Sequence, residues 1–224
     1  MKNDRNADAR AGSLKQIYLI TEGLSTDENF PERKAQILDL IKGAIETKIS
    51  LIQIREKQLS ARNVFELTSE AAKLAKNSNT KILVNDRADI ALAANADGVH
   101  LTANSLSAET IRRNFPKDFL IGVSTHSIEK TEEAKRQGAN FAVFGPVFRT
   151  PGKGEPKGLE ELREICEKVK PFPVIPIGGI DETNYREALE IAGGFAAIRF
   201  LNDLENLRKI KEFTAETPRR RDFF

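Results

Sequence analysis

The chain repeats one pattern eight times: a short apolar segment, then a segment whose apolar residues recur at helical spacing. The apolar segments lie at 16–21, 49–54, 81–85, 98–101, 119–123, 141–144, 174–177 and 195–201. The helical segments lie at 31–48, 61–77, 88–96, 108–115, 128–137, 159–169, 182–192 and 204–213. Short apolar runs with little polar alternation are typical of parallel strands that are buried on both faces.

Eight uninterrupted β–α repeats predict an α/β fold, a single (β/α)8 TIM barrel. A chain of 224 residues is long enough for one such domain. A doubly wound open sheet is the alternative, but the GxGxxG motif is absent after the first apolar segment. The prediction assigns a flexible, polar leader to 1–14, the barrel to 15–213 and a charged tail to 214–224.

Composition excludes several classes of function. The 35 basic and 33 acidic residues nearly balance, so nucleic acid is not an expected partner. Cys166 is the only cysteine, which excludes an intrachain disulfide and a cysteine-based zinc site and favours a structural role. The leader lacks the apolar region of a secretory signal, and no apolar run reaches the ~18 to 20 residues of a membrane span. We therefore expect a cytoplasmic protein with no membrane partner; association into a homo-oligomer is left open.

In a barrel of this kind the active site lies at the carboxyl ends of the strands, on the loops that lead into the helices. Polar residues follow the predicted strands at these ends: Gln53, Arg55, Glu56, Lys57, Asn85, Asp86, Arg87, His100, Thr102, Asn104, Ser105, Ser124, Thr125, His126, Thr150, Lys153 and Arg199. The sequence therefore predicts a polar site at one end of the barrel.

Two regions of this end suit anions. The loop within 141–158 is rich in glycine and carries Thr150 and Lys153, while Gly178 and Gly179 follow the seventh strand. Glycines let backbone N–H groups approach an anion, and barrels commonly build a phosphate site after strands seven and eight. Gly178 and Gly179, together with Arg199 on the eighth strand, are thus expected to bind a monophosphate.

The second region combines Arg55, Lys57 and Lys153 with Asp86. Three cations beside a carboxylate that can hold magnesium suit a pyrophosphate leaving group. Alternatives remain at single positions. Arg55 and Lys57 would also make an ordinary surface pair, and Asn85 with Asp86 would also cap the next helix.

The two histidines have alternatives as well. His126 would serve either as a proton carrier or as a cap. His100 fits a hydrogen-bonded core histidine better than a catalytic one.

Six ordered motifs, QIREK, NDRADIA, DGVHL, IGVSTHS, FGPVFRTPGK and PIGGI, resemble the superfamily of thiamine phosphate synthases and TenI-type thiazole tautomerases. The resemblance covers about 18–201. It implies a transferase that joins hydroxymethylpyrimidine pyrophosphate to thiazole phosphate, with release of pyrophosphate, in thiamine biosynthesis.

The resemblance also implies roles for single residues. Pyrophosphate would be held by Arg55, Lys57, Asn85 and Lys153, and magnesium by Asp86. Ser124 and Thr150 would contact the pyrophosphate or the pyrimidine, Gly179 the thiazole phosphate, and Gln53 would belong to the substrate site. The expected partners are therefore small phosphorylated substrates.

The sequence departs from the synthase pattern at three positions. Ser105 stands where the synthases carry a second magnesium-binding aspartate, Gly152 replaces a hydroxyl residue, and Arg199 replaces a serine at the phosphate. The stretch TANSLS is similar to the tautomerase branch, in which the residue matching His126 transfers protons without a metal. A tautomerase, or a regulatory barrel that binds phosphate without catalysis, is therefore carried as the alternative to the synthase.

Overall fold

The computed structural model describes residues 16–215 of the chain, with the side chains described as far as Lys211. The predicted leader, and positions 216–224 of the predicted tail, lie outside the described residues. Eight strands alternate with helices: β1 Gln16–Ile20, β2 Leu51–Ile54, β3 Lys81–Asn85, β4 Gly98–Leu101, β5 Leu120–Thr125, β6 Phe141–Phe144, β7 Val174–Pro176 and β8 Gly194–Ala197.

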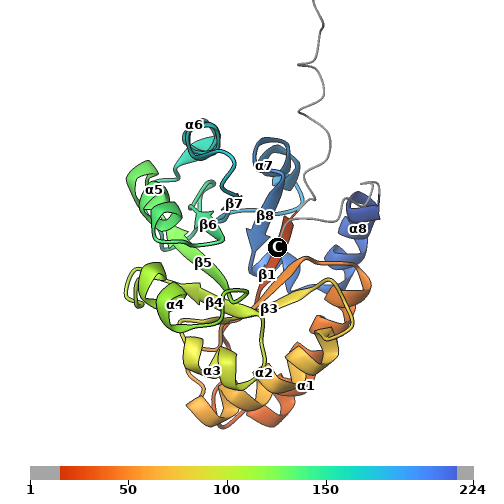
Figure 1. Cartoon of the computed structure of the whole chain (residues 1–224). Helices are drawn as coiled ribbons and strands as arrows, with labels where there is room; N and C mark the ends of the chain where they lie inside the picture. The colour runs from red at the N-terminus through yellow and green to blue at the C-terminus, as the bar shows by residue number, and fades with distance from the viewer. Residues whose placement is uncertain (1–15, 216–224) are drawn as a thin grey trace, which may run out of the picture.

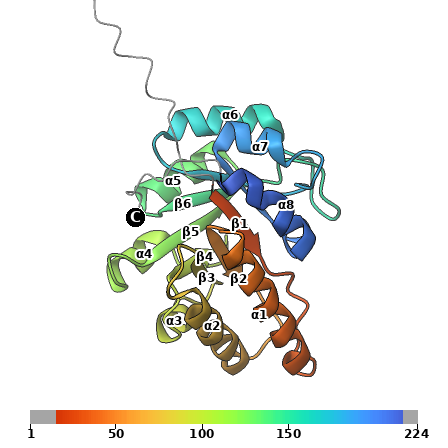
Figure 2. The same ribbon diagram turned by 90° about the vertical axis from the view of Figure 1, so that its right-hand side faces the viewer.

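The strands form one parallel sheet in the order β7-β6-β5-β4-β3-β2-β1-β8. A parallel bridge between Ile177 and Ala196 brings its two edges together, so the sheet closes nearly completely into a barrel. The helices surround the strands in Figure 1, and the view in Figure 2 shows the same ring from the side, with α6 and α7 next to each other. The predicted (β/α)8 barrel is confirmed.

The helices begin close to the predicted positions: α1 Phe30–Glu46, α2 Ala61–Ala75, α3 Ala88–Ala93, α4 Ala108–Asn114, α5 Ile128–Arg136, α6 Gly158–Val169, α7 Tyr185–Ala192 and α8 Leu204–Ala215. Serine side chains cap three of them, because Ser60, Ser107 and Ser127 each accept a hydrogen bond from a backbone N–H of the first turn. No helix in the range 16–215 is long and apolar enough to cross a membrane.

Three predicted boundaries are wrong by three residues or more, and one of them is the end of α3, which lies at Ala93 and not at 96. Helix α7 begins three residues after the predicted 182, because Asp181 accepts hydrogen bonds from Thr183 and holds the chain in a turn. The eighth strand ends at Ala197, and Arg199–Leu201 is a short 3-10 helix. Asn202 stabilises this turn by donating to the carbonyl oxygens of Ile20 and Ile198.

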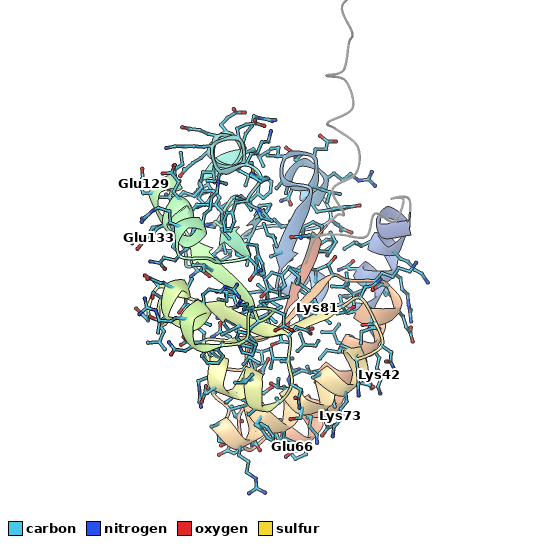
Figure 3. All side chains as sticks on the ribbon, in the orientation of Figure 1. Lys42, Glu66, Lys73, Lys81, Glu129 and Glu133 are labelled. Atoms are coloured by element: carbon cyan, nitrogen blue, oxygen red, sulfur yellow. The ribbon has the colours of Figure 1, made fainter. Side chains whose placement is uncertain are left out.

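The strands have two apolar faces because alternate side chains point to opposite sides of a sheet. The inner cluster fills the barrel and contains Tyr18, Ile20, Leu51, Leu83, Leu120, Phe141, Val143, Ile175 and Ala196. The outward residues pack against the helices, as Ile52, Ile82 and Phe195 do. Charged side chains such as Lys42, Glu66 and Glu129 lie on the outer faces of the helices (Figure 3). Burial on both faces explains why the strands read as unbroken apolar runs.

Polar groups near the amino-terminal ends of the strands are bound to the fold itself. The Arg112 guanidinium donates hydrogen bonds to the carbonyl oxygens of Lys117, Phe119 and Gly138 and to Oδ1 of Asn140. The four acceptors lie just before β5 and β6. A partly buried network of hydrogen bonds therefore holds this end of the barrel together.

Candidate active site

The inner face of β2 to β5 becomes polar towards the carboxyl ends. The register pairs Ile20 with Gln53 and Asn85 with His100, so that the polar side chains continue the inward alternation of the apolar core. Gln53 Nε2 donates to Asn85 Oδ1 at 2.9 Å, but Gln53 Oε1 is buried without a partner among the described residues. An unpaired buried acceptor is costly, so Gln53 Oε1 is free to accept a hydrogen bond from a ligand.

A hydrogen-bonded chain crosses the barrel just below this end. The hydroxyl oxygen of Tyr18 on β1 lies 3.3 Å from Nδ1 of His100 on β4. Nε2 of His100 lies 2.8 Å from the hydroxyl oxygen of Ser124 on β5. Burial, followed by the charge of Arg55, lowers the pKa of His100 from 6.5 to about 4. His100 is thus neutral near pH 7, as expected for a core histidine, but it also reaches the site through Ser124.

Arg55 is placed at the mouth of the barrel by the first residues after β2. Its backbone N–H donates to the Thr21 hydroxyl at 2.8 Å, while its guanidinium makes no hydrogen bond or ion pair with a described residue. Glu56 is buried and accepts from the backbone N–H groups of Gly23 and Ser25. Glu56 therefore holds the loop after β1, and Arg55 keeps its charge available for an anion.

Asp86 follows β3 with a left-handed backbone, φ 65°, and an exposed side chain. The Ser105 hydroxyl donates to its carboxylate and also accepts from the backbone N–H of Thr102. The capping alternative is wrong, because α3 has Arg87 as its N-cap and no side chain caps it. Within residues 16–215, no three His, Cys, Asp or Glu side chains form a group suited to a metal ion.

Gly178 and Gly179 form the turn after β7. Both have positive φ, 99° and 66°, and a Cβ on either would lie within 2.6 Å of Pro146 or of the Arg149 carbonyl oxygen. Only glycine fits such a crowded left-handed turn. In the described part of the chain, neither backbone N–H makes a hydrogen bond, so both can donate to an anion.

The loop after β6 packs against this turn. The Phe148 N–H donates to the Gly178 carbonyl oxygen at 3.0 Å, and the Thr150 hydroxyl lies beside Gly178. The Lys153 side chain, by contrast, is exposed further along the loop, as are the side chains of Lys57 and Arg199. The structure thus brings Thr150 to the glycine turn but does not join these three cations to a common contact.

His126 lies beyond β5 and is exposed, with Nδ1 2.5 Å from the carbonyl oxygen of Gly145. A carbonyl oxygen only accepts, so Nδ1 carries the proton and Nε2 of the neutral ring is left as a base. Ser127, not His126, caps helix α5. The capping alternative for His126 is therefore wrong.

Sequence reasoning missed Tyr18, whose hydroxyl is fully buried against His100. The signal was present, because a tyrosine two residues before the end of an apolar strand places a hydroxyl inside the barrel. Cys166 matches its expected structural role: burial raises the pKa of its thiol to about 11, which keeps it protonated.

Comparison with known proteins identifies the family. The profile of the family described as thiamine monophosphate synthase matches residues 17–201. The chain belongs to this family. It is 35% identical over 199 residues to the thiamine-phosphate synthase of Clostridium acetobutylicum, covering 88% of this chain and 90% of the relative. It is 38% identical over 197 residues to that of Campylobacter jejuni, covering 85% and 87%.

Solved structures give the same picture for the fold. A thiamine phosphate pyrophosphorylase from Pyrococcus furiosus superposes with a TM-score of 0.74 at 32% identity, covering 89% of this chain and 96% of that one. A KDPG aldolase from Legionella pneumophila superposes with a TM-score of 0.60 at 14% identity, which reflects the shared barrel alone.

Proposed function

We propose that this chain is a thiamine phosphate synthase, a transferase that joins hydroxymethylpyrimidine pyrophosphate to thiazole phosphate and releases pyrophosphate. The observation that carries the proposal is the pair of anion-suited places on one barrel mouth. Arg55 and Asp86 lie after β2 and β3, and the free N–H groups of Gly178 and Gly179 lie after β7. Family membership and the names of the relatives support the same reaction.

The leaving group would bind on the side of β2 and β3. The C–O bond to the pyrophosphate breaks with both electrons on oxygen, so negative charge builds on the leaving group. Arg55, Lys57 and Lys153 would stabilise this charge, and the amide of Asn85 would donate to it. Cations at these positions would accelerate the reaction by binding the departing pyrophosphate more strongly than the intact substrate.

The other substrate would bind towards β7 and β8. Its phosphate would accept from the N–H groups of Gly178 and Gly179, with Arg199 adding a full charge. The thiazole nitrogen would then attack the methylene cation of the pyrimidine and form the new C–N bond. Thr150 and Ser124 would line the space between the two anions, and Gln53 Oε1 would accept from the pyrimidine.

The oxygen ligands beside the pyrophosphate region fit magnesium, although they are few. Asp86 is exposed, and the neutral hydroxyl of Ser105 is the one side chain among the described residues that donates a hydrogen bond to its carboxylate. Magnesium is usually held by one or two carboxylates, water and substrate phosphates. Asp86 would be its protein ligand, and the ion would neutralise charge on the leaving group.

The decisive experiment mixes the purified chain with both substrates, with and without magnesium, and follows thiamine phosphate and pyrophosphate. Product that depends on magnesium supports the synthase. Isomerisation or deuterium exchange of thiazole phosphate alone would replace it with a tautomerase. Absence of both reactions would leave a phosphate-binding barrel.

A matched pair of variants tests the leaving-group region. Lys153→Ala should lower turnover by roughly a hundredfold or more, because a charge at the transition state is lost. Lys42→Ala removes an exposed lysine from the outer face of α1 and should leave turnover unchanged (Figure 3). Equal turnover in both variants would remove Lys153 from the site.

One observation favours the tautomerase as a second candidate. The hydrogen bond from His126 Nδ1 to Gly145 leaves Nε2 free to take a proton from a substrate. His126→Asn keeps a donor near Nδ1 but removes this base. Loss of proton exchange on the thiazole in this variant, with thiamine phosphate formation retained, would establish a second activity at the same mouth.

A further inference from the structure

The chain of Tyr18, His100 and Ser124 has a direction that hydrogen-bond donors and acceptors determine. Tyr18 and His100 are 0% and 3% exposed, and His100 is the one described hydrogen-bond partner of the Tyr18 hydroxyl. The phenol has a single proton to donate, and a buried donor without an acceptor is strongly disfavoured. Tyr18 therefore donates to Nδ1 of His100.

The direction then passes to Ser124. If Nδ1 accepts, the proton of the neutral imidazole is on Nε2, which lies 2.8 Å from the Ser124 oxygen. Nε2–H donates to that oxygen, and the hydroxyl proton of Ser124 is left to donate elsewhere. The reverse arrangement, with Nδ1–H donating to Tyr18, would leave the buried phenolic proton without an acceptor.

The surroundings keep the ring neutral and in place. Burial and the charge of Arg55 disfavour the imidazolium, and the ring of Tyr18 lies 5.9 Å from that of His100 between centroids. Gly122 provides the space, because a Cβ there would lie 2.5 Å from Phe141 and 3.2 Å from Nδ1 of His100. The imidazole is thus enclosed on several sides within the barrel.

We propose that His100 is a positioning residue, held by Tyr18 in its Nε2–H form, which makes Ser124 a hydrogen-bond donor to an acceptor atom of the pyrimidine pyrophosphate. This inference rests on the proposed function for the identity of the substrate. It assigns a polarity to the site: Ser124 selects an acceptor, such as a pyrophosphate oxygen or an unprotonated ring nitrogen, over an amino group.

The first test reads the tautomer directly and needs no turnover. The chain contains two histidines, so an untagged protein labelled with nitrogen-15 in histidine gives two imidazole patterns, assigned with His126→Asn. We expect a protonated Nε2 on His100 and a protonated Nδ1 on His126. Protonation of Nδ1 on His100, or of both its nitrogens, would overturn the proposal even if the enzyme is active.

Variants then test whether His100 acts through Ser124. Tyr18→Phe removes only the hydroxyl and should lower kcat/KM by about tenfold, as expected for one lost hydrogen bond, and release the fixed tautomer. His100→Gln, whose amide can accept from Tyr18 and donate to Ser124, should retain more activity than His100→Leu. In a Ser124→Ala background, His100→Leu should cost nothing further.

The outcomes separate the two proposals. Additive losses from Ser124→Ala and His100→Leu, or no rescue by His100→Gln, would overturn the positioning role. If the wild-type protein forms no thiamine phosphate, the proposed function fails. The tautomer of His100 still tests the direction of the hydrogen bonds from Tyr18 through His100 to Ser124.

Discussion

Two arginines, Arg112 and Arg55, show how the ends of the barrel differ. The Arg112 guanidinium, near the amino-terminal ends of β5 and β6, donates five hydrogen bonds to acceptors on the protein. The Arg55 guanidinium, at the opposite end, makes no hydrogen bond or ion pair with any described residue. The same side chain thus stabilises the fold at one end and stays available for a ligand at the other.

The same contrast extends to the groups around each arginine. At the amino-terminal end of the strands, Asp97 accepts hydrogen bonds from the Lys81 ammonium and from the backbone N–H of Ile82. At the carboxyl end of the strands, Gln53 Oε1 and the N–H groups of Gly178 and Gly179 have no hydrogen-bond partner among the described residues. Polar groups without a partner in the protein are free to bind a ligand, so this end suits a polar substrate.

The largest expected effects come from removing the two arginines separately. Arg55→Ala should lower kcat/KM by about a thousandfold and leave the melting temperature nearly unchanged, because only a transition-state charge is lost. Arg112→Ala should instead destabilise the chain by about 3 kcal/mol, because several partly buried carbonyl oxygens lose their donor. Steady-state kinetics and urea unfolding measure the two. A large loss of stability in Arg55→Ala would show that Arg55 also stabilises the fold.

Acid should lower the free energy of unfolding, because His100 is buried in its neutral form. Its pKa is lowered by burial from 6.5 to about 4, so below pH 6.5 the unfolded chain binds a proton that the folded chain does not. This stability is therefore present above pH 6.5 and is lost as the pH falls towards 4, by about 3 kcal/mol in all. Urea unfolding at several pH values measures the loss. His100→Gln should remove this part of the pH dependence, and His126→Asn should retain it.

Two glycines on loops at the carboxyl end of the strands, Gly179 and Gly154, should respond differently to a side chain. Gly179→Ala should destabilise the chain by about 2 kcal/mol and weaken binding of thiazole phosphate, because its backbone is left-handed and crowded. Gly154→Ala is the matched control, since a Cβ at Gly154 meets nothing within 4 Å. Calorimetric titration and thermal unfolding test both variants. Equal behaviour of the two would show that the turn tolerates a side chain.

The smallest expected effect concerns magnesium. Ser105 donates to Asp86, and removal of a partner that orients a metal ligand typically weakens affinity by tenfold or more. Ser105→Ala should therefore raise the magnesium concentration for half-maximal activity by roughly tenfold. Thr110→Ala removes an exposed hydroxyl on α4 and serves as the control. An unchanged magnesium requirement would separate Ser105 from the metal region.

The barrel was predictable from local pattern. Strands such as Gly98–Leu101 and Phe141–Phe144 agree with their predicted bounds because burial on both faces demands unbroken apolar runs. The eighth strand was predicted too long, since Ile198 and Phe200 read as apolar strand residues. Their conformation depends on Asn202, whose side chain bonds to β1 from the far end of the chain.

The position of the candidate residues at the strand ends was predictable, but their contacts were not. Gln53, Asn85 and Ser124 come at the ends of predicted strands, which places them near the carboxyl end of a parallel barrel. No local rule predicted that Glu56 would hold a loop while Arg55 beside it stays unpaired. Neighbouring residues on a chain point to different surroundings, and those surroundings come from segments distant in sequence.

The repeat, the parallel barrel, the family and the barrel end at which polar residues gather were therefore readable from the sequence alone. These follow from periodicity and motif order, which are properties of short segments. The hydrogen-bond partners of His100 and His126, and the pairing of Ser105 with Asp86, became evident only in the tertiary structure. These hydrogen bonds join side chains that are distant in sequence, and closure of the sheet into a barrel brings them within hydrogen-bond distance.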